Sequence, residues 1–421
     1  PNIGPHGRVQ NVEVSPHDPA KAYATILRYQ LGDFAPYAFR TEDYGQSWVR
    51  ITTGENGVPA DHPVRVVRED PDRQGLLYAG TEFGLFVSFD DGVRWQPLQL
   101  NLPVTPVSDI KVVNQDLILS TMGRGFWILD DLTPLHELSR QVALSDTHLF
   151  AVRDTYRLYG VRRFGGDPSP DEPKYPDPGA NIDYYLASDA AGEVRLEILD
   201  DTGRLVRSFS SESVPKQSLP SSVRMNEWHL EAVGTAQLPK TAGIHRFVWD
   251  LRHAGPWDPL DSRSGRNGPM VVPGIFQARL TLGGWSNTQN FEVMVDPRVV
   301  DEGTASQANL EAQVRLGLEV RDALSDARFA AMKLDEARDG APDQLLALLK
   351  EIKEALVTAP VRYSRPVIID QLSYLYSNLI RADQQPGEDA FNRYQELNSM
   401  LSDHIGRLEQ LLQTNNFRGE N

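Results

Sequence analysis

Two carboxylates near the start of the chain have the chemistry of a general acid and a general base. Glu82 and Asp33 lie in short segments rich in turn-forming residues, TEFG (81–84) and RYQLGDFAP (28–36). Carboxyl groups separated by about 5–10 Å can protonate and attack a glycosidic bond. In comparable segments, Arg8 and Arg124 could clamp a carboxylate or a sulfate through paired hydrogen bonds.

Two histidines, His6 and His62, complete this set of candidate binding residues. The alternative for all six side chains is solvation or pairing with a neighbour, which is the usual state of charged residues on tight turns. Other histidines follow no metal-ligand spacing, and no Gly-x-Ser-x-Gly nucleophile pattern occurs. We therefore predict no metal and no cofactor, and Glu82 and Asp33 remain the candidates for catalysis.

An eight-residue pattern occurs twice in the same region, as TEDYGQSW (41–48) and SFDDGVRW (88–95). The hydroxyl and carboxylate side chains can accept hydrogen bonds from turn N–H groups, and glycine permits left-handed backbone. The tryptophan can wedge between neighbouring sheets. We interpret both copies as structural turns, built by Thr41, Asp43, Gly45 and Trp48 and by Ser88, Asp90, Gly92 and Trp95.

The segments around these turns also repeat. Residues 12–25 align with 67–80 at an offset of 55, the two turns follow at an offset of 47, and 119–131 is a degenerate third copy. Repeats of about 40–50 residues with three or four short strands each are typical of β-propeller blades. The sequence predicts strands near 9–14, 21–27, 37–41 and 48–52, then 64–68, 76–80, 85–88 and 95–98, then 107–113, 117–121 and 126–130.

The order of strands in a blade predicts where the loops lie. A meandering blade places the entry to its first strand and the loop between its second and third strands on one face. That face should carry residues 4–8, 28–36, 61–65, 81–84, 105–109 and 122–125, with the eight-residue turns on the opposite face.

The composition changes after this region, which we assign to 1–140. Residues 141–181 are rich in Pro, Gly and Asp and indicate a linker, in which Asp167, Asp171 and Asp177 lack the regular spacing of a calcium loop. Alternating apolar residues predict an immunoglobulin-like β-sandwich over 182–300 with Trp249 in its core. Helical periodicity predicts an antiparallel bundle over 301–421, opened by a capping box of Thr304 and Gln307. The predicted fold class is thus multidomain and mainly β, with a helical C-terminal part.

Composition restricts the partners. The chain of 421 residues has a formal net charge of −16, which argues against nucleic acid and anionic membrane surfaces. It has no cysteine and therefore no disulfide framework. No apolar run approaches the roughly 18 residues of a membrane span.

The turns and the residues that follow them resemble a known family. Bacterial Asp-box (neuraminidase-repeat) β-propeller proteins have segments similar to FRTEDYGQSW, to the stretch from VREDPDRQG to PVSDI (67–110) and to GRGFWILDD (123–131). A module that follows the propeller in that family resembles GIHRFVWDLR (243–252) and VPGIFQARLTL (272–282). These proteins are similar to the sortilin luminal domain and are often labelled glycosyl hydrolases. The resemblance covers nearly the whole chain as a C-terminal part and implies an exported protein, periplasmic, surface-bound or secreted, with further blades before Pro1.

Two functions remain open from the sequence. The first is a binding or assembly module of the envelope or exterior, in which a further polypeptide or chain segment completes the propeller and the face binds a protein or glycan. The second is a secreted glycoside hydrolase that acts on a polysaccharide. The arginine triad of sialidases and the paired aspartates of tandem-propeller glucanases have no match here, and we favour binding.

Overall fold

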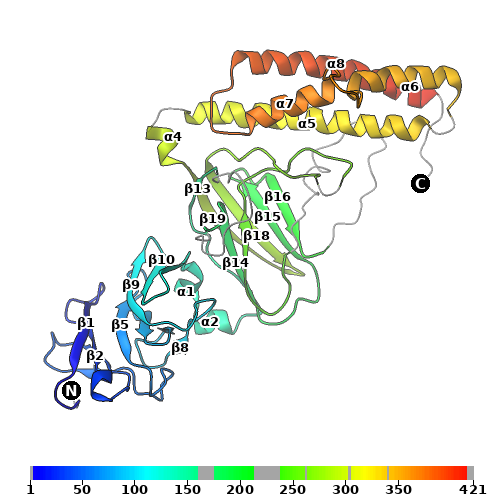
Figure 1. Cartoon of the computed structure of the whole chain (residues 1–421). Coiled ribbons are helices and arrows are strands. Elements are labelled where there is room, and N and C mark those ends of the chain that lie inside the picture. The colour runs from blue at the N-terminus through cyan, green and yellow to red at the C-terminus, as the bar shows by residue number, and fades with distance from the viewer. Residues whose placement is uncertain are drawn as a thin grey trace. The chain divides into compact units, whose positions relative to one another are not determined.

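The computed structural model describes residues 3–159, 175–212, 238–260, 263–301, 305–338 and 341–414. The chain divides into two compact units, Pro1–Arg140 and Gln141–Asn421, which are described separately. Both units contain β-sheets, and the second also carries the long helices (Figure 1).

The first unit consists of three antiparallel sheets that follow one another along the chain. The strands are β1 Arg8–Val14, β2 Ala22–Leu27, β3 Ala38–Thr41 and β4 Val49–Arg50; β5 Val64–Glu69, β6 Leu77–Thr81, β7 Leu85–Ser88 and β8 Gln96–Pro97; and β9 Val107–Val113, β10 Asp116–Thr121 and β11 Phe126–Leu129. Each lies where the sequence predicts a strand. The short helices η1 Tyr29–Leu31 and α1 Thr133–Glu137 complete this unit, and α2 Arg140–Ala143 begins at its last residue and continues into the second unit.

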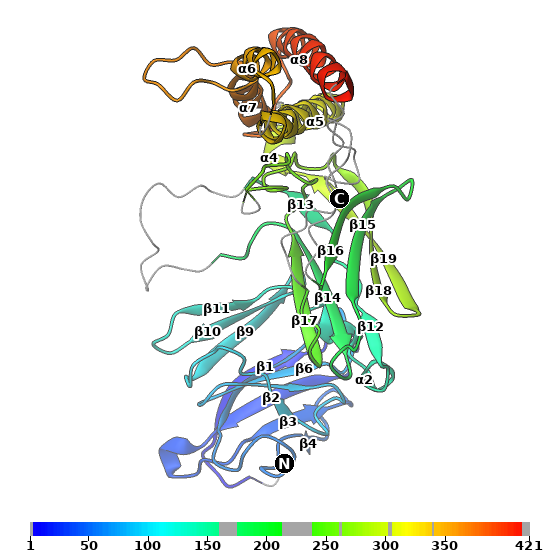
Figure 2. The same cartoon turned by 90° about the vertical axis from the view of Figure 1, so that its right-hand side faces the viewer.

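The middle sheet shows how the three sheets pack. All five residues of β6 are buried, because this strand has a neighbour on each face. Leu77 belongs to a cluster with Tyr23 of the first sheet, and Tyr78 to a cluster with Ile110 of the third. Sheets stacked through their faces in chain order fit part of a β-propeller (Figure 2).

The two outer faces of this stack are apolar and exposed. A bulge between Val9 and Asn11 places Val9, Val12 and Val14 on one face of β1, and all three are exposed. On the third sheet, Phe126 of β11 is 81% exposed and Ile128 is also exposed. In the middle sheet, the corresponding faces are covered by the neighbouring sheets.

The second unit begins with two sheets that share one core. Their strand orders are β12-β14-β17 and β13-β19-β18-β15-β16. The strands are β12 Thr147–Leu149, β13 Thr155–Arg157, β14 Ala180–Leu186, β15 Val194–Asp200, β16 Leu205–Ser210, β17 Gly243–Trp249, β18 Gly274–Leu282 and β19 Trp285–Val295. Trp249 is fully buried between them, as the sequence predicts, and its ring centroid lies 5.6 Å from that of Phe276 and 6.1 Å from that of Phe291.

The interval 141–181 differs from the predicted linker. β12 pairs with β14, and β13 pairs in parallel with β19, so the first part of this interval contributes strands to both sheets. The strands are only three residues long, which is too short for an alternating pattern to reveal them. Asp167 and Asp171 of the considered calcium cluster lie outside the described residues.

The C-terminal region is helical, as predicted. Its helices are α4 Pro297–Asp301, α5 Gln307–Arg338, α6 Asp343–Leu356, α7 Ile368–Leu379 and α8 Glu388–Thr414. The four long helices lie side by side around one apolar core that includes Leu324, Leu349, Leu372 and Leu401 (Figures 1 and 2). Thr304 lies outside the described residues, and Ser306 accepts a hydrogen bond from the Asn309 amide at 3.2 Å at the start of α5.

The long helices α5 and α8 carry charged residues throughout their length. Among the described residues, no helix combines the length and the apolar character needed to cross a bilayer.

Candidate functional site

A pocket of about 490 Å³ opens among the loops of the first unit. Four of the six segments predicted to share a face contribute to it, namely 28–36, 61–65, 81–84 and 105–109. Its walls are mainly apolar and aromatic: Tyr29, Phe34, Pro63, Arg65, Glu82, Phe83, Val104, Thr105 and Pro106 line it. The loops of three consecutive sheets therefore converge on one cavity.

An ion pair lies among these apolar walls. Arg65 Nη2 is 2.7 Å from Glu82 Oε1, and both side chains are mostly buried. Neither Arg65 Nε nor Glu82 Oε1 makes an aligned hydrogen bond within the described residues. Both of these atoms are buried, and the pair neutralises its own charge within the apolar walls.

Local backbone geometry fixes Glu82 and Phe83 at the pocket. The Glu82 amide donates to the Pro63 carbonyl at 3.0 Å, and the Phe83 amide donates to Thr81 Oγ1 at 3.1 Å. Gly84 follows with a φ of +145°, and a Cβ on it would lie 2.0 Å from Gln99 Oε1. Glycine is therefore required at this position of the TEFG turn.

Asp33, the predicted partner of Glu82, does not line the pocket. Its carboxylate accepts hydrogen bonds from Arg28 Nε at 2.8 Å, Tyr37 Oη at 2.9 Å and the Ala35 amide at 3.2 Å. Partial burial would raise the pKa of Asp33, but the bonds from Arg28 and Tyr37 outweigh it and lower this pKa. Asp33 therefore stays ionised, and an ionised carboxylate cannot protonate a leaving group.

The remaining predicted binding residues also lie outside the lining. His62 Nδ1 is 2.8 Å from Asp61 Oδ1, and its ring packs 4.6 Å from that of Phe83, so His62 supports the wall of the pocket. His6, Arg8 and Arg124 are exposed and do not line this pocket. The sequence reasoning missed Phe34, Phe83 and Val104, which are exposed apolar residues inside or beside the predicted loops.

The two eight-residue turns have nearly identical hydrogen bonds. In the first, the Ser47 amide donates to Asp43 Oδ1 at 2.8 Å and the Gly45 amide to Thr41 Oγ1 at 2.9 Å. The second repeats these bonds at Asp90 and Ser88, with the same two distances. The bonds from Ser47, with that from Thr41, lower the pKa of Asp43 to about 2.

The turns need two left-handed residues in succession, not glycine alone. Tyr44 and Asp91 have φ values of 58° and 59°, and Gly45 and Gly92 follow with 85° and 86°. Asp91 uses this conformation to reach the first sheet. Its carboxylate accepts from Lys21 Nζ at 2.8 Å, Tyr23 Oη at 2.9 Å and Arg40 Nη1 at 2.7 Å.

The two tryptophans of these turns have different partners. Trp95 is 5% exposed, and its Nε1 donates to the Ile51 carbonyl of the preceding repeat at 2.8 Å. Trp48 is partly exposed, and its Nε1 donates to Gly45 of its own turn at 3.1 Å. The tryptophan of the second turn thus bonds the neighbouring sheet, whereas the tryptophan of the first turn bonds its own turn.

One group of metal-type ligands occurs within the described residues, formed by Asp70, Asp72 and His136. Asp70 is fully buried, and its carboxylate accepts from the Asp72 and Arg73 amides, Tyr78 Oη and His136 Nε2. Burial would raise the pKa of Asp70, but the bonds from His136, Asp72 and Tyr78 lower it. Four donors already occupy this carboxylate, so the group is a hydrogen-bonded support.

No family model matches the chain, and no curated protein does. Solved structures match weakly. PorZ, a surface component of the type-IX secretion system of Porphyromonas gingivalis, has 14% identity and a TM-score of 0.23, covering 68% of this chain and 30% of PorZ. A GH74 xyloglucanase from Xanthomonas campestris has 13% identity and a TM-score of 0.23, covering 64% and 42%.

The extracellular domain of a one-component system from B. thetaiotaomicron is similar at 9% identity and a TM-score of 0.23, covering 68% of this chain and 31% of that one. The chain therefore spans roughly a third of the length of these structures.

Proposed function

We propose that the chain is a binding or assembly module that acts outside the cytoplasm, with its first unit forming blades of an Asp-box β-propeller. The observation that carries this proposal is the pocket at the loops, where exposed Phe34, Phe83 and Val104 surround the Arg65–Glu82 ion pair. Apolar walls with a few oriented polar atoms are typical of ligand sites. The ligand that fits is an apolar anchor side chain of a partner polypeptide, with a polar backbone group beside it.

The alternative, a glycoside hydrolase, is less well supported. Such an enzyme needs one carboxylic acid with a raised pKa and a second carboxylate facing it across the bond. Glu82 is paired with Arg65, and Asp33 has a lowered pKa and lies outside the lining. Release of reducing ends from a polysaccharide, abolished by Glu82→Gln, would contradict the binding proposal.

Binding at this pocket is tested with the Phe83→Ala variant. Peptides selected by phage display against the full chain should carry an apolar anchor and should lose about tenfold or more in affinity for Phe83→Ala, because the ring forms part of the wall. Tyr44→Ala is the matched control, since Tyr44 is an exposed aromatic on an eight-residue turn outside the pocket. Equal loss in both variants would refute the site.

We also infer that a further blade covers the outer faces of the three sheets. The middle sheet has a neighbouring sheet on each face, but the outer faces of the first and third sheets expose apolar side chains. These are Val9, Val12 and Val14 on β1, and Phe126 and Ile128 on β11. Tyr44 is exposed and Trp48 bonds its own turn, whereas Trp95 and Asp91 hold the preceding sheet. A propeller ring needs about four to eight blades. The occupant is therefore a blade of the same kind, supplied by another polypeptide or chain segment.

Without such a blade, the chain should self-associate through these faces. Light scattering after size-exclusion chromatography should give a mass above 47.1 kDa that rises with concentration. Val12→Glu should shift the protein toward the monomer, because a carboxylate cannot be buried in an apolar interface. Val93→Glu, at an exposed valine on the second turn, is the control and should change nothing. A monodisperse wild-type monomer would contradict the inference.

We further infer that the two sheets of the second unit form an immunoglobulin-type sandwich that, with the helices, spaces the propeller from other structures. Two features support this assignment. One sheet has the order β13-β19-β18-β15-β16, with β13 parallel to β19, and a separate sheet has the order β12-β14-β17. Trp249 between the two sheets is consistent with it.

A further inference from the structure

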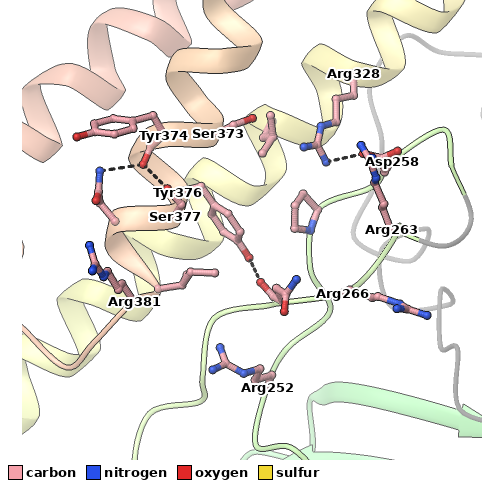
Figure 3. Close-up of a pocket in the computed structure, with 15 residues that line it drawn as sticks. Arg252, Asp258, Arg263, Arg266, Arg328, Ser373, Tyr374, Tyr376, Ser377 and Arg381 are labelled. Carbon is pink, nitrogen blue, oxygen red and sulfur yellow. Dashed lines mark hydrogen bonds and ion pairs between the residues drawn. The ribbon is translucent and has the colours of Figure 1, made fainter. Parts of the chain in front are cut away.

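A second cavity, of about 800 Å³, lies within the second unit between residues of the segments 252–260 and 263–267 and the helices α5 and α7 (Figure 3). The sequence reasoning assigned no role to this segment. Five arginines line the cavity: Arg252, Arg263, Arg266, Arg328 and Arg381. The one acidic residue of the lining is Asp258, so the cavity has four more positive than negative charges in a chain whose net charge is −16.

Three of these arginines have no partner for their guanidinium groups in the part of the chain that the structure describes. Within the described residues, Arg263, Arg266 and Arg381 make no side-chain hydrogen bond and no ion pair, and all three are exposed. The other two are anchored. Arg328 Nη1 lies 3.3 Å from Asp258 Oδ2, and Arg252 Nη1 donates to the Gly268 carbonyl at 2.8 Å.

The segment that carries Arg263 and Arg266 is fixed to the helices. The Trp257 amide donates to Ser325 Oγ at 2.9 Å, and the Trp257 ring lies edge-on to Phe329 with 5.4 Å between centroids. Tyr376 Oη donates to the Asn267 carbonyl at 2.7 Å (Figure 3). Ser325 and Phe329 are fully buried. The arginines therefore extend from a scaffold that is held on both sides.

Arginine charges in this part of the second unit act on one another and on a buried histidine. Burial lowers the pKa of Arg328, the charge of Asp258 raises it, and the charge of Arg263 lowers it. Burial, with the charges of Arg321, Arg204 and Arg207, lowers the pKa of His253 to about 3. Like charges held together on a rigid scaffold repel one another, and a cleft lined by one sign of charge attracts a ligand of the other sign.

The rest of the lining is suited to hydroxyl groups and a ring. Ser373, Ser377 and Asn378 of α7 provide hydroxyl and amide groups, and Tyr374 on the same helix is 73% exposed. Aromatic faces pack against the apolar faces of sugar rings, and serine, asparagine and aspartate groups bond their hydroxyls. Planar guanidinium groups pair with carboxylate and sulfate oxygens.

We propose that this cavity binds an acidic saccharide that carries at least two oxyanion groups. Arg263, Arg266 and Arg381 hold the oxyanions, and Tyr374 and the polar groups of α7 hold the sugar. Sulfate and uronic carboxylate groups share this chemistry. The cavity volume is within the roughly 300–1,000 Å³ of ordinary ligand sites.

The test is calorimetric titration of the full chain with two probes, a heparin-derived hexasaccharide and a galacturonate hexamer. Binding of either is expected, with the tighter of the two identifying sulfate or carboxylate as the preferred oxyanion. The affinity should fall about tenfold or more in the double variant Arg263→Ala/Arg266→Ala and in Arg381→Ala, because each removes charge-assisted bonds. These side chains are exposed and have no ion pair within the described ranges, so the variants should keep the wild-type melting temperature.

The control is Arg362→Ala/Arg365→Ala, which removes two exposed arginines that do not line the cavity. It should bind as the wild type does. Three outcomes would overturn the proposal: no binding of either hexamer, equal affinity in the Arg263→Ala/Arg266→Ala variant and the wild type, or tighter binding of inorganic phosphate or of a single-stranded oligonucleotide than of both saccharides.

Discussion

Replacing Asp91 by asparagine is expected to lower the free energy of unfolding of the first unit by about 3 kcal/mol, because it removes the carboxylate that three donors of a mostly buried charge cluster share. Lys21 then keeps Glu69 at 3.6 Å, and Arg40 keeps Glu42 at 3.2 Å. Asp91 binds Lys21, Tyr23 and Arg40 of the preceding repeat, and the Lys21 side chain is 6% exposed. Burial, with the charges of Asp91 and Glu69, raises the pKa of Tyr23, so the phenol remains a donor. Asparagine tolerates the left-handed backbone at this position, which isolates the loss of charge.

The matched control is Tyr44→Asn, at the same position of the first turn. Tyr44 is 74% exposed with a φ of 58°, and its replacement should change the free energy of unfolding by about 0.5 kcal/mol or less. Hydrogen exchange of the full chain, followed by mass spectrometry on peptides from β2, β3 and β5, measures both. Equal protection in the two variants would show that Asp91 does not hold the sheets together.

Trp95→Ala should destabilise the first unit by about 3–5 kcal/mol, the usual cost of removing a buried tryptophan side chain. Trp95 packs with Ile51, Val58 and Phe86 at the junction of the first two sheets, and its Nε1 bonds Ile51. Trp48→Ala should cost about 1 kcal/mol or less, because Trp48 is partly exposed and its Nε1 bonds its own turn. Urea unfolding of the full chain, followed by hydrogen exchange of the same peptides, distinguishes the two variants.

The stability costs of Trp48→Ala and Trp95→Ala should also be compared after a further blade has been added. Bound to that blade, Trp48 should become as buried as Trp95, and Trp48→Ala should then weaken the association. Comparable costs for the two substitutions in the isolated chain would mean that Trp48 already has a partner. That result would contradict the inference of an uncovered outer face.

Periodic features of the sequence predicted much of the fold. Alternation and the repeated turns located the strands of the first unit, and the helical period located α5 to α8. The two short strands in 141–181 were missed, because three residues cannot show a period and their pairing partners are remote: Leu149 pairs with Tyr184 and Thr155 with Val293. A local sequence pattern carries no information about pairing between strands that lie far apart in the chain.

The candidate site was predicted only at the level of loops. A meander fixes which loops share a face, so Glu82 and the segment containing Phe34 were correctly placed near one another. The partners of a carboxylate were not predictable, because Glu82 is paired with Arg65 of the neighbouring strand β5 and Asp33 is bonded to Arg28 and Tyr37. The arginine cavity was missed for the same reason, since its lining comes from segments more than a hundred residues apart.

One contact in the second unit bears on the order in which the chain can fold during synthesis. Arg157 is 1% exposed, donates to the Val271 carbonyl at 2.9 Å and is paired with Asp383, which lies 226 residues later. Ribosomes add roughly 5–20 residues per second, so Arg157 emerges on the order of ten seconds or more before its acidic partner. Until then its guanidinium must stay hydrated. The strand that carries it, β13, therefore docks late, and the sandwich is finished only once the helices have been made.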